Sequence, residues 1–282
     1  WANQAFALTV ITVVVPTLLS SMFNLANGGS ADYAGMTFTG DSFYAVVLGI
    51  SSVFVAIVSP ILGAIADRMP IKKRILKIYT IVGILFTGLM GLAPYMDDGS
   101  SYKFLAICLI MGNIGFAGGH AIYSAFLPYL GDKRLMDHIS SWGYAYGFLG
   151  GSTLLTIHLI VGLKLGFNDP NVQSFVFLTS ALWWLGFSIP FFRDTPEPDI
   201  PNPTEYASFG EAVVDGIREI RNTFSEIRRY RILTLFMIGY LLFYDGINAI
   251  GGLAAAYADS VLRIDFSMNF VLLLSANIAA IP

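Results

Sequence analysis

Long runs without a charged residue alternate with short charged segments along the chain. A bilayer core about 30 Å thick requires about 20 apolar residues of helix, since the backbone must satisfy its own hydrogen bonds there. Eight runs are interpreted as spans, and one of them carries a single carboxylate, Asp245. They are Trp1 to Ala31, Phe43 to Ala66, Ile78 to Met96, Phe104 to Gly131, Ile139 to Leu163, Pro170 to Phe192, Ile232 to Ala258, and Phe266 to the end. The pattern predicts an all-α, polytopic membrane helix bundle.

Basic residues gather on one side of the predicted membrane. Lys and Arg accumulate in the cytoplasmic loops of membrane proteins. Only Lys103, Lys164 and Arg263 lie in the odd-numbered loops. The other 13 of the 16 basic residues lie in the even-numbered loops: Arg68, Lys72, Lys73, Arg74, Lys77, Lys133, Arg134, Arg193, Arg218, Arg221, Arg228, Arg229 and Arg231. This division predicts a cytoplasmic amino end and a cytoplasmic central loop.

The central loop, residues 193–231, has two parts. Its proline-rich start is an extended connector, because proline cannot continue the preceding helix. Ser208 and Glu211 then have the spacing of a capping box. An apolar stripe follows at helical spacing: Phe209, Val213, Ile217, Ile220, Phe224 and Ile227. We expect an amphipathic helix at the membrane surface, and a partner-binding helix is the alternative.

The composition agrees with a membrane protein. Charged residues make up 12% of the 282 residues, against about 25% in soluble domains. The formal charge of −3 provides no basic field for nucleic acid. The single cysteine, Cys108, cannot form an internal disulfide and is expected to fill the core. Catalytic and metal-binding spacings are absent from the sequence, so we expect neither an enzyme nor a cofactor.

The turn after the second span, GAIADRMPIKKR, carries the most distinctive motif. Gly63 permits close helix approach, and Asp67 at a helix end can pair with a cation. Gly63, Asp67, Arg68 and Arg74 together resemble the signature of the major facilitator superfamily. The resemblance implies a conformational latch between the two halves of the transporter. An ordinary basic turn that only sets topology is the alternative.

Further stretches resemble the "unknown major facilitator" branch, which includes the autophagy-related vacuolar amino acid effluxers. They are WANQAF at the start, AFLPYL around Pro128, SSWGYAYGFLGG from Ser140 to Gly151, and FYDGIN in the seventh span. The resemblance implies a twelve-helix facilitator, alternating access and amino acid substrates. The chain is then a fragment with eight of twelve spans. Residues 1–192 form the amino-terminal six-helix bundle, 193–231 the linker, and 232–282 the first two helices of the second bundle.

Asp245 is the strongest candidate for coupling transport to a proton or cation. It lies near the middle of its span, where an ionised carboxylate is costly and usually functional. Asn248 follows at i+3, on the same face. A faint internal repeat places Asn248 over Asn3, so these two are expected to face each other across a central cavity. An Asp that only ties helices together is the alternative.

Other polar side chains are weaker candidates for a substrate site. Gln4 neighbours Asn3, while Asn113 and His120 are seven residues apart and share one face of the fourth span. A structural histidine whose hydrogen bonds are made to a neighbouring helix is an equally favoured alternative for His120. Tyr146 is assigned to the cavity by analogy only.

Three glycines in the fifth span have helical spacing that suits close packing. Gly143, Gly147 and Gly151 are four residues apart and form one ridge. Static packing and sliding between two rocking halves both remain open.

These features favour a secondary active transporter of a small solute, possibly an amino acid, in a bacterial inner membrane or a vacuolar-type membrane. Its expected partners are the substrate, membrane lipid, and a coupling proton or cation. The alternatives are a uniporter, a channel-like facilitator or a membrane scaffold. A channel would need a continuous polar stripe over many spans, and an intramembrane enzyme would need paired ionisable groups at one depth.

Overall fold

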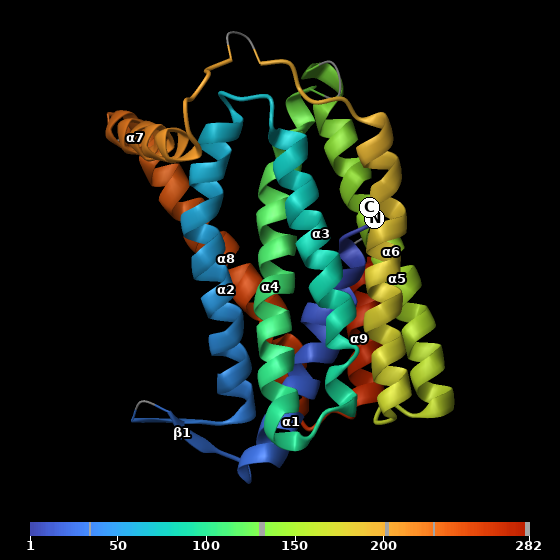
Figure 1. The fold of residues 1–282 in the computed structure, drawn as a ribbon. Coiled ribbons are helices and arrows are strands. Elements are labelled where there is room, and N and C mark those ends of the chain that lie inside the picture. The colour runs from blue at the N-terminus through green and yellow to red at the C-terminus, as the bar shows by residue number, and fades with distance from the viewer. Residues whose placement is uncertain (34, 130–132, 201–202, 228, 280–282) are drawn as a thin grey trace.

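Helices make up nearly all of the regular structure in the computed structural model, which describes residues 1–33, 35–129, 133–200, 203–227 and 229–279 (Figure 1). The predicted all-α class is confirmed, and one antiparallel hairpin, β1 with β2, is added to it. The elements are η1 (Phe6–Val14), α1 (Val15–Asn27), β1 (Ala31–Tyr33), β2 (Met36–Phe38), α2 (Gly40–Ala66), α3 (Lys72–Met90), η2 (Ala93–Tyr95), α4 (Asp98–Ser124), η3 (Leu127–Tyr129), η4 (Lys133–Leu135), α5 (Met136–Leu165), α6 (Pro170–Asp194), α7 (Phe209–Ile227), α8 (Arg231–Ser260) and α9 (Phe266–Ala279).

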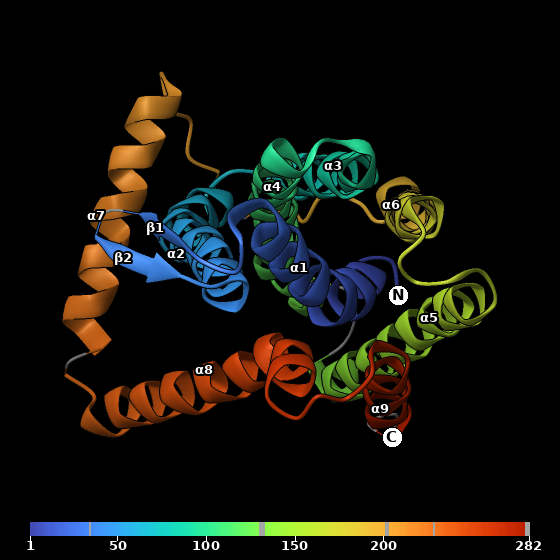
Figure 2. The same ribbon diagram turned by 90° about the horizontal axis from the view of Figure 1, so that it is seen from below.

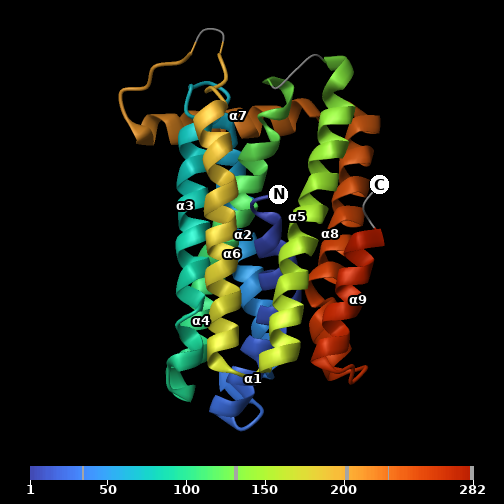
Figure 3. The ribbon, with the colours of Figure 1, turned by 90° about the vertical axis from the view of Figure 1, so that its right-hand side faces the viewer.

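The first six predicted spans are helical segments long and apolar enough to cross a membrane, and they run side by side (Figures 1 and 3). Several helices begin before the charge-free runs do. Helix α3 starts at Lys72 rather than Ile78, and α4 starts at Asp98 rather than Phe104. Charge-free runs mark the hydrocarbon region, whereas a helix can continue into the polar headgroups. The seventh and eighth predicted spans coincide with α8 and α9.

The first span runs through the middle of the hydrophobic core. Phe6, Val10 and Leu19 are fully buried within it. Residues Phe6–Val14 form a π-helix that continues directly into α1. The phenol of Tyr44 on α2 donates a hydrogen bond to the carbonyl oxygen of Ile11 at 3.0 Å. The wider π turn thus has a partner on a neighbouring helix.

Small residues let α3, α4 and α6 approach closely. A Cβ atom at Gly115 would fall on the backbone of Gly83, so α3 and α4 meet with almost no side chain between them. A Cβ atom at Gly83 would collide with the indole of Trp184 on α6. Cys108 is buried in the same core, as predicted.

Helix α7 lies across the other helices, beside the end of α2 (Figures 1 and 3). We call this end of the bundle, where α2 ends and α3 begins, the α7 end. Seen from the opposite end, α7 runs outside α2, and α9 lies beside α5 (Figure 2). Helix α8 contacts η1 and α1. The helices after the linker therefore pack on the first and fifth spans.

Candidate functional site

The turn between α2 and α3 holds the four residues of the predicted latch. Gly63 lies in the last turn of α2, and a Cβ atom there would meet no atom within 4 Å. The carboxylate of Asp67 lies 2.8 Å from the ammonium of Lys72. Arg68 points toward α7, and Arg74 lies exposed on α3. Among these four, Arg68 makes the contact between distant segments.

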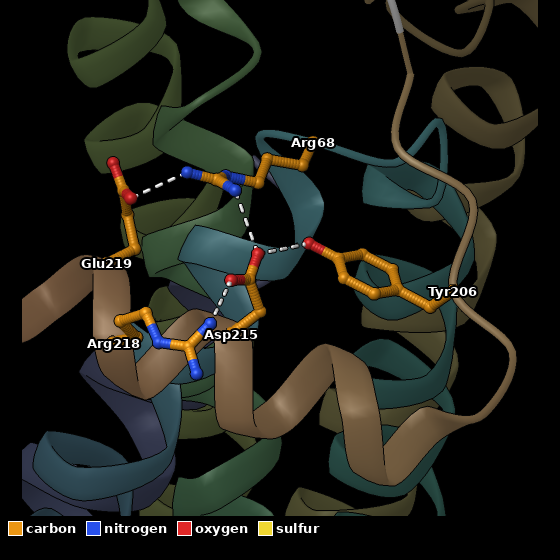
Figure 4. A network of polar contacts seen from close by, with 5 residues as sticks. All are labelled: Arg68, Tyr206, Asp215, Arg218 and Glu219. Atoms are coloured by element: carbon orange, nitrogen blue, oxygen red, sulfur yellow. Dashed lines mark hydrogen bonds and ion pairs between the residues drawn. The ribbon is translucent and has the colours of Figure 1, made fainter.

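Arg68 joins the α2–α3 turn to the linker helix (Figure 4). Its Nη1 lies 2.8 Å from Asp215 Oδ2 and its Nη2 lies 2.6 Å from Glu219 Oε2. The Tyr206 hydroxyl donates to Asp215 Oδ2 at 2.7 Å, and Arg218 lies 3.6 Å from Asp215 Oδ1. Asp215 and Glu219 are one helical turn apart, so a single guanidinium reaches both.

The electrostatics of this network keep its hydrogen-bond donors protonated. The hydrogen bond to Asp215 raises the pKa of Tyr206, with partial desolvation acting in the same direction. Desolvation acts to lower the pKa of Arg68, but the hydrogen bond with Tyr206 and the charges of Glu219 and Asp215 outweigh it and raise the pKa. Both donors, Arg68 and Tyr206, therefore stay protonated at neutral pH.

The connector that precedes α7 crosses the same turn. The Lys73 ammonium donates to the carbonyl oxygen of Thr195 at 2.6 Å, and the Lys73 backbone N–H donates to the Glu197 carboxylate at 2.9 Å. Further along, the backbone N–H of Thr204 donates to the carbonyl oxygen of Arg68 at 2.9 Å. The two ends of the connector are thus held on the first turn of α3 and on the α2–α3 turn.

A cavity of about 430 Å³ lies among the first span, α3, α4, α5 and α6, toward the α7 end. Three predicted substrate-site residues lie on its wall, Asn3, Gln4 and His120, together with two glycines of the predicted ridge, Gly143 and Gly147. The His120 imidazole stacks on Phe116, with ring centroids 6.4 Å apart. The rest of the wall is rich in aromatic and hydroxyl side chains, including Trp1, Thr80, Tyr123, Ser124, Ser140, Tyr144, Trp184, Phe187, Ser188, Phe191 and Phe192.

Two other candidates lie away from this cavity. The amide of Asn113 is buried and donates to Ser51 Oγ at 2.7 Å, which joins α4 to α2. Tyr146 is exposed, and its ring lies 5.7 Å from that of Trp142 and 6.5 Å from that of Trp1. Asn113 therefore holds helices together in this structure, although it shares a helix with His120.

The glycine ridge of α5 faces the start of the chain. A Cβ atom at Gly151 would overlap Leu8 and approach Gln4, and one at Gly147 would touch Gln4 at 4.0 Å. A Cβ atom at Gly143 would meet no atom within 4 Å. Two of the three glycines thus lie beside the first span.

Asp245 and Asn248 belong to α8, but their side chains lie outside the described residues. The expected approach of Asn248 to Asn3 likewise stays a prediction.

Sequence reasoning missed the partners of Arg68. Asp215 and Glu219 have the i, i+4 spacing of two side chains on one helix face, opposite the apolar stripe, and that spacing was the available signal. Tyr206 gave no signal in the sequence. His158, a residue with no predicted role, is fully buried on α5, and its Nε2 lies 2.8 Å from Thr179 Oγ1 on α6.

Comparison with known proteins finds relatives named as an MFS-type transporter and as autophagy-related proteins. The uncharacterized MFS-type transporter YxiO of Bacillus subtilis is 25% identical over 290 residues, covering 100% of this chain and 63% of that protein. Autophagy-related protein 22 of Kluyveromyces lactis is 23% identical over 300 residues, covering 93% of this chain and 60% of that protein. Autophagy-related protein 22 of Yarrowia lipolytica is 28% identical over 141 residues, covering 44% of this chain and 24% of that protein.

The chain spans less than two thirds of the length of these relatives. No solved structure matches it significantly. The family model described as "Vacuole effluxer Atg22 like" matches residues 1–282, and this match confirms the resemblance predicted from the motifs. The chain therefore belongs to the family of vacuole effluxers like Atg22.

Proposed function

We propose that this chain is part of a secondary transporter that moves a small solute across a membrane by alternating access. The family match over all 282 residues carries the proposal. The six long apolar helices and the packing of α8 and α9 on the first and fifth spans support it. Residues 1–192 would form one half, 193–231 the linker, and 232–282 the start of the second half, which rocks against the first.

We propose an amino acid as the substrate, the class that the motif resemblance implies and that suits the chemistry of the cavity wall. The amides of Asn3 and Gln4 both donate and accept hydrogen bonds, so they suit the ammonium and carboxylate groups of an amino acid. The His120 imidazole adds a third polar group to the same cavity. Aromatic rings on the wall offer contact to an apolar or cationic group of the substrate.

Asp245 is the residue that we propose couples transport to a proton or cation gradient. It lies in the middle of α8, at position 15 of the 30 helical residues. A carboxylate at that depth is costly unless it is protonated or paired, so a change in its charge can be linked to a conformational change. Asn248 lies one turn away on the same face and would share the site.

The orientation of the transporter follows from its basic residues. We propose that the α7 end is cytoplasmic, since 13 of the 16 Lys and Arg residues fall in the loops of that side. Either a bacterial inner membrane or a vacuolar-type membrane is compatible with this orientation.

Flux measurement on the full-length protein tests the proposal. Protein reconstituted in vesicles is expected to move a labelled amino acid in response to an imposed proton or cation gradient. The Asp245→Asn variant is expected to lose gradient-driven accumulation and to keep exchange of substrate down its own gradient. Asp265→Asn, in the loop before α9, is the matched control and is expected to behave as wild type.

The alternatives give distinct results in this assay. Solute flux that is independent of every imposed ion gradient would identify a uniporter. Flux that does not saturate with rising solute concentration would identify a channel-like facilitator. Folded protein that moves no solute at all would contradict the transporter proposal and favour a scaffold.

A further inference from the structure

Helix α7 lies against α2 at a depth that belongs to the membrane-spanning part of α2. A Cβ atom at Gly216 would come within 3.3 Å of the carbonyl oxygen of Ile61 and of the Ile65 side chain. Ala212, one turn before Gly216, is also buried. Ile61 lies inside the apolar helix Gly40–Ala66, so α7 lies level with the last turns of that span.

Three of the six residues in the apolar stripe of α7 are exposed, and the other three are partly buried. Phe209 is 68% exposed, Ile217 50% and Phe224 62%. Side chains of this size are seldom left in water along one continuous helix face. Helix α2 also exposes apolar side chains, among them Val53 and Ile57. The stripe therefore requires an apolar environment of its own.

Arg68 sets the direction in which the stripe points. A helix turns by about 100° per residue, so the stripe is centred about 140° around α7 from Asp215 and Glu219. Those two carboxylates reach up to Arg68, which lies beyond the last turn of α2 (Figure 4). Around the axis of α7, the face that contacts α2 lies between the face with the two carboxylates and the face with the stripe. Because the carboxylates point past the end of α2, the stripe points the opposite way along α2, toward the middle of the span.

Charged residues complete an arrangement suited to the membrane surface. The side chains of Arg218 and Arg221 are exposed on the sides of α7 that do not touch α2. Guanidinium groups at that level can bind lipid phosphates while apolar side chains enter the acyl region. Moreover, α7 lies across the spans, which is the direction of a helix in the membrane plane (Figure 3).

We propose that α7 is a membrane-interface helix whose stripe inserts among the lipid acyl chains just below the headgroups, with Arg68 fixing its rotation about its own axis. The occupant of the exposed face is the lipid bilayer itself. The linker between the two halves is then attached to both the α2–α3 turn and the membrane.

Collision measurements with spin labels test this proposal on the full-length protein in liposomes. The labelled variants are Ile217→Cys and Phe224→Cys, each combined with Cys108→Ala. Labels at both positions are expected to collide more often with oxygen, which concentrates in lipid, than with a water-soluble nickel chelate. Asn222→Cys, on the polar side of α7, is the matched control and is expected to show the reverse order.

Removing the Arg68 side chain tests whether Arg68 fixes the rotation of α7 about its own axis. Arg68→Ala is expected to make the collision rates of the labels at positions 224 and 222 more alike. Arg193→Ala, which removes an exposed ion pair with Asp194, is expected to leave the difference in collision rates unchanged.

Two results would overturn the proposal. Equal collision of the 224 and 222 labels with the nickel chelate would place the stripe in water. Low collision of the 224 label with both reagents would show that protein covers it. Neither result depends on the folding of the Arg68 variant, because both are measured on protein that retains Arg68.

Discussion

Close packing of glycines dominates the α3–α4 contact, whereas the α2–α7 contact combines two small residues with an ion-pair network. Between α3 and α4, Gly83 and Gly115 bring the two backbones together and leave no room for a side chain. Between α2 and α7, the main contact outside Ala212 and Gly216 is the ion-pair network of Arg68. The first contact lies within the spans and the second lies at the α7 end.

The difference follows from the solvent at each place. Lipid chains are as apolar as leucine, so helices in the membrane associate through close van der Waals packing rather than through hydrophobic burial. At the membrane surface, water screens charges, so an ion pair there contributes little stability but fixes geometry. A single substitution should therefore reduce stability strongly when it enlarges a glycine between α3 and α4, and only slightly when it removes a charge from the α2–α7 network.

The largest effect is expected from Gly115→Leu. Its side chain would collide with the backbone of Gly83 and with the carbonyl oxygen of Tyr79, neither of which can move aside locally. Such overpacking costs about 1–3 kcal/mol or more, and it should lower the thermal unfolding midpoint sharply. Gly186→Ala on α6, where a Cβ atom meets nothing, is the control. Wild-type stability of Gly115→Leu would show that α3 and α4 do not pack this closely.

A moderate effect is expected from breaking the buried hydrogen bond between Asn113 and Ser51. Asn113→Ala should lower the free energy of unfolding by roughly 1 kcal/mol, in the range of hydrogen bonds between membrane helices. Ser51→Ala and the double variant should cost about the same, because both remove one interaction. Additive losses would contradict the pairing. Ser52→Ala is the control, because this exposed hydroxyl donates to the carbonyl oxygen of Leu48 on the same helix.

A smaller effect is expected from Arg68→Ala. The side chains of Arg68, Asp215 and Glu219 are 36%, 24% and 43% exposed, so water screens the network. The free energy of unfolding should fall by no more than about 1 kcal/mol, and less at high salt. A loss as large as that of Gly115→Leu would reverse the proposed order of the two contacts. Arg193→Ala serves as the exposed-pair control.

The smallest effect is expected from Glu197→Ala. This carboxylate accepts a hydrogen bond from the Lys73 backbone N–H in the first turn of α3, where a negative charge also favours the helix dipole. The expected loss is about 0.5 kcal/mol, measured by thermal unfolding at low salt. Glu205→Ala in the same connector should change nothing. A loss equal for both variants would remove the special role of Glu197.

The fold was largely predictable from the sequence because one physical constraint dominates it. Charged residues cannot face hydrocarbon, so the charge-free runs located the first six spans, and the stripe from Phe209 to Ile227 matched α7 residue for residue. The predicted capping box also forms in part. The backbone N–H of Glu211 bonds Ser208 Oγ, while the Glu211 carboxylate reaches the N–H of Ala207.

The candidate site was less predictable, because it depends on how side chains from distant segments meet. Asn3, Gln4 and His120 reach one cavity, but Asn113 on the same helix as His120 bonds Ser51 instead. Sequence spacing fixes which face of a helix a residue occupies and leaves open which neighbour that face meets. The partners of Arg68 were hidden for the same reason.

The hydrogen bonds that hold the connector to Arg68 and Lys73 shorten the free chain before α8. The sequence predicts an extended connector and a helix in residues 193–231, and the structure fastens both to the α2–α3 turn and the start of α3. Helix α7 ends at Ile227 and α8 begins at Arg231, so three residues separate them. If α8 moves relative to α2, the short stretch between α7 and α8 leaves little free chain to take up the movement.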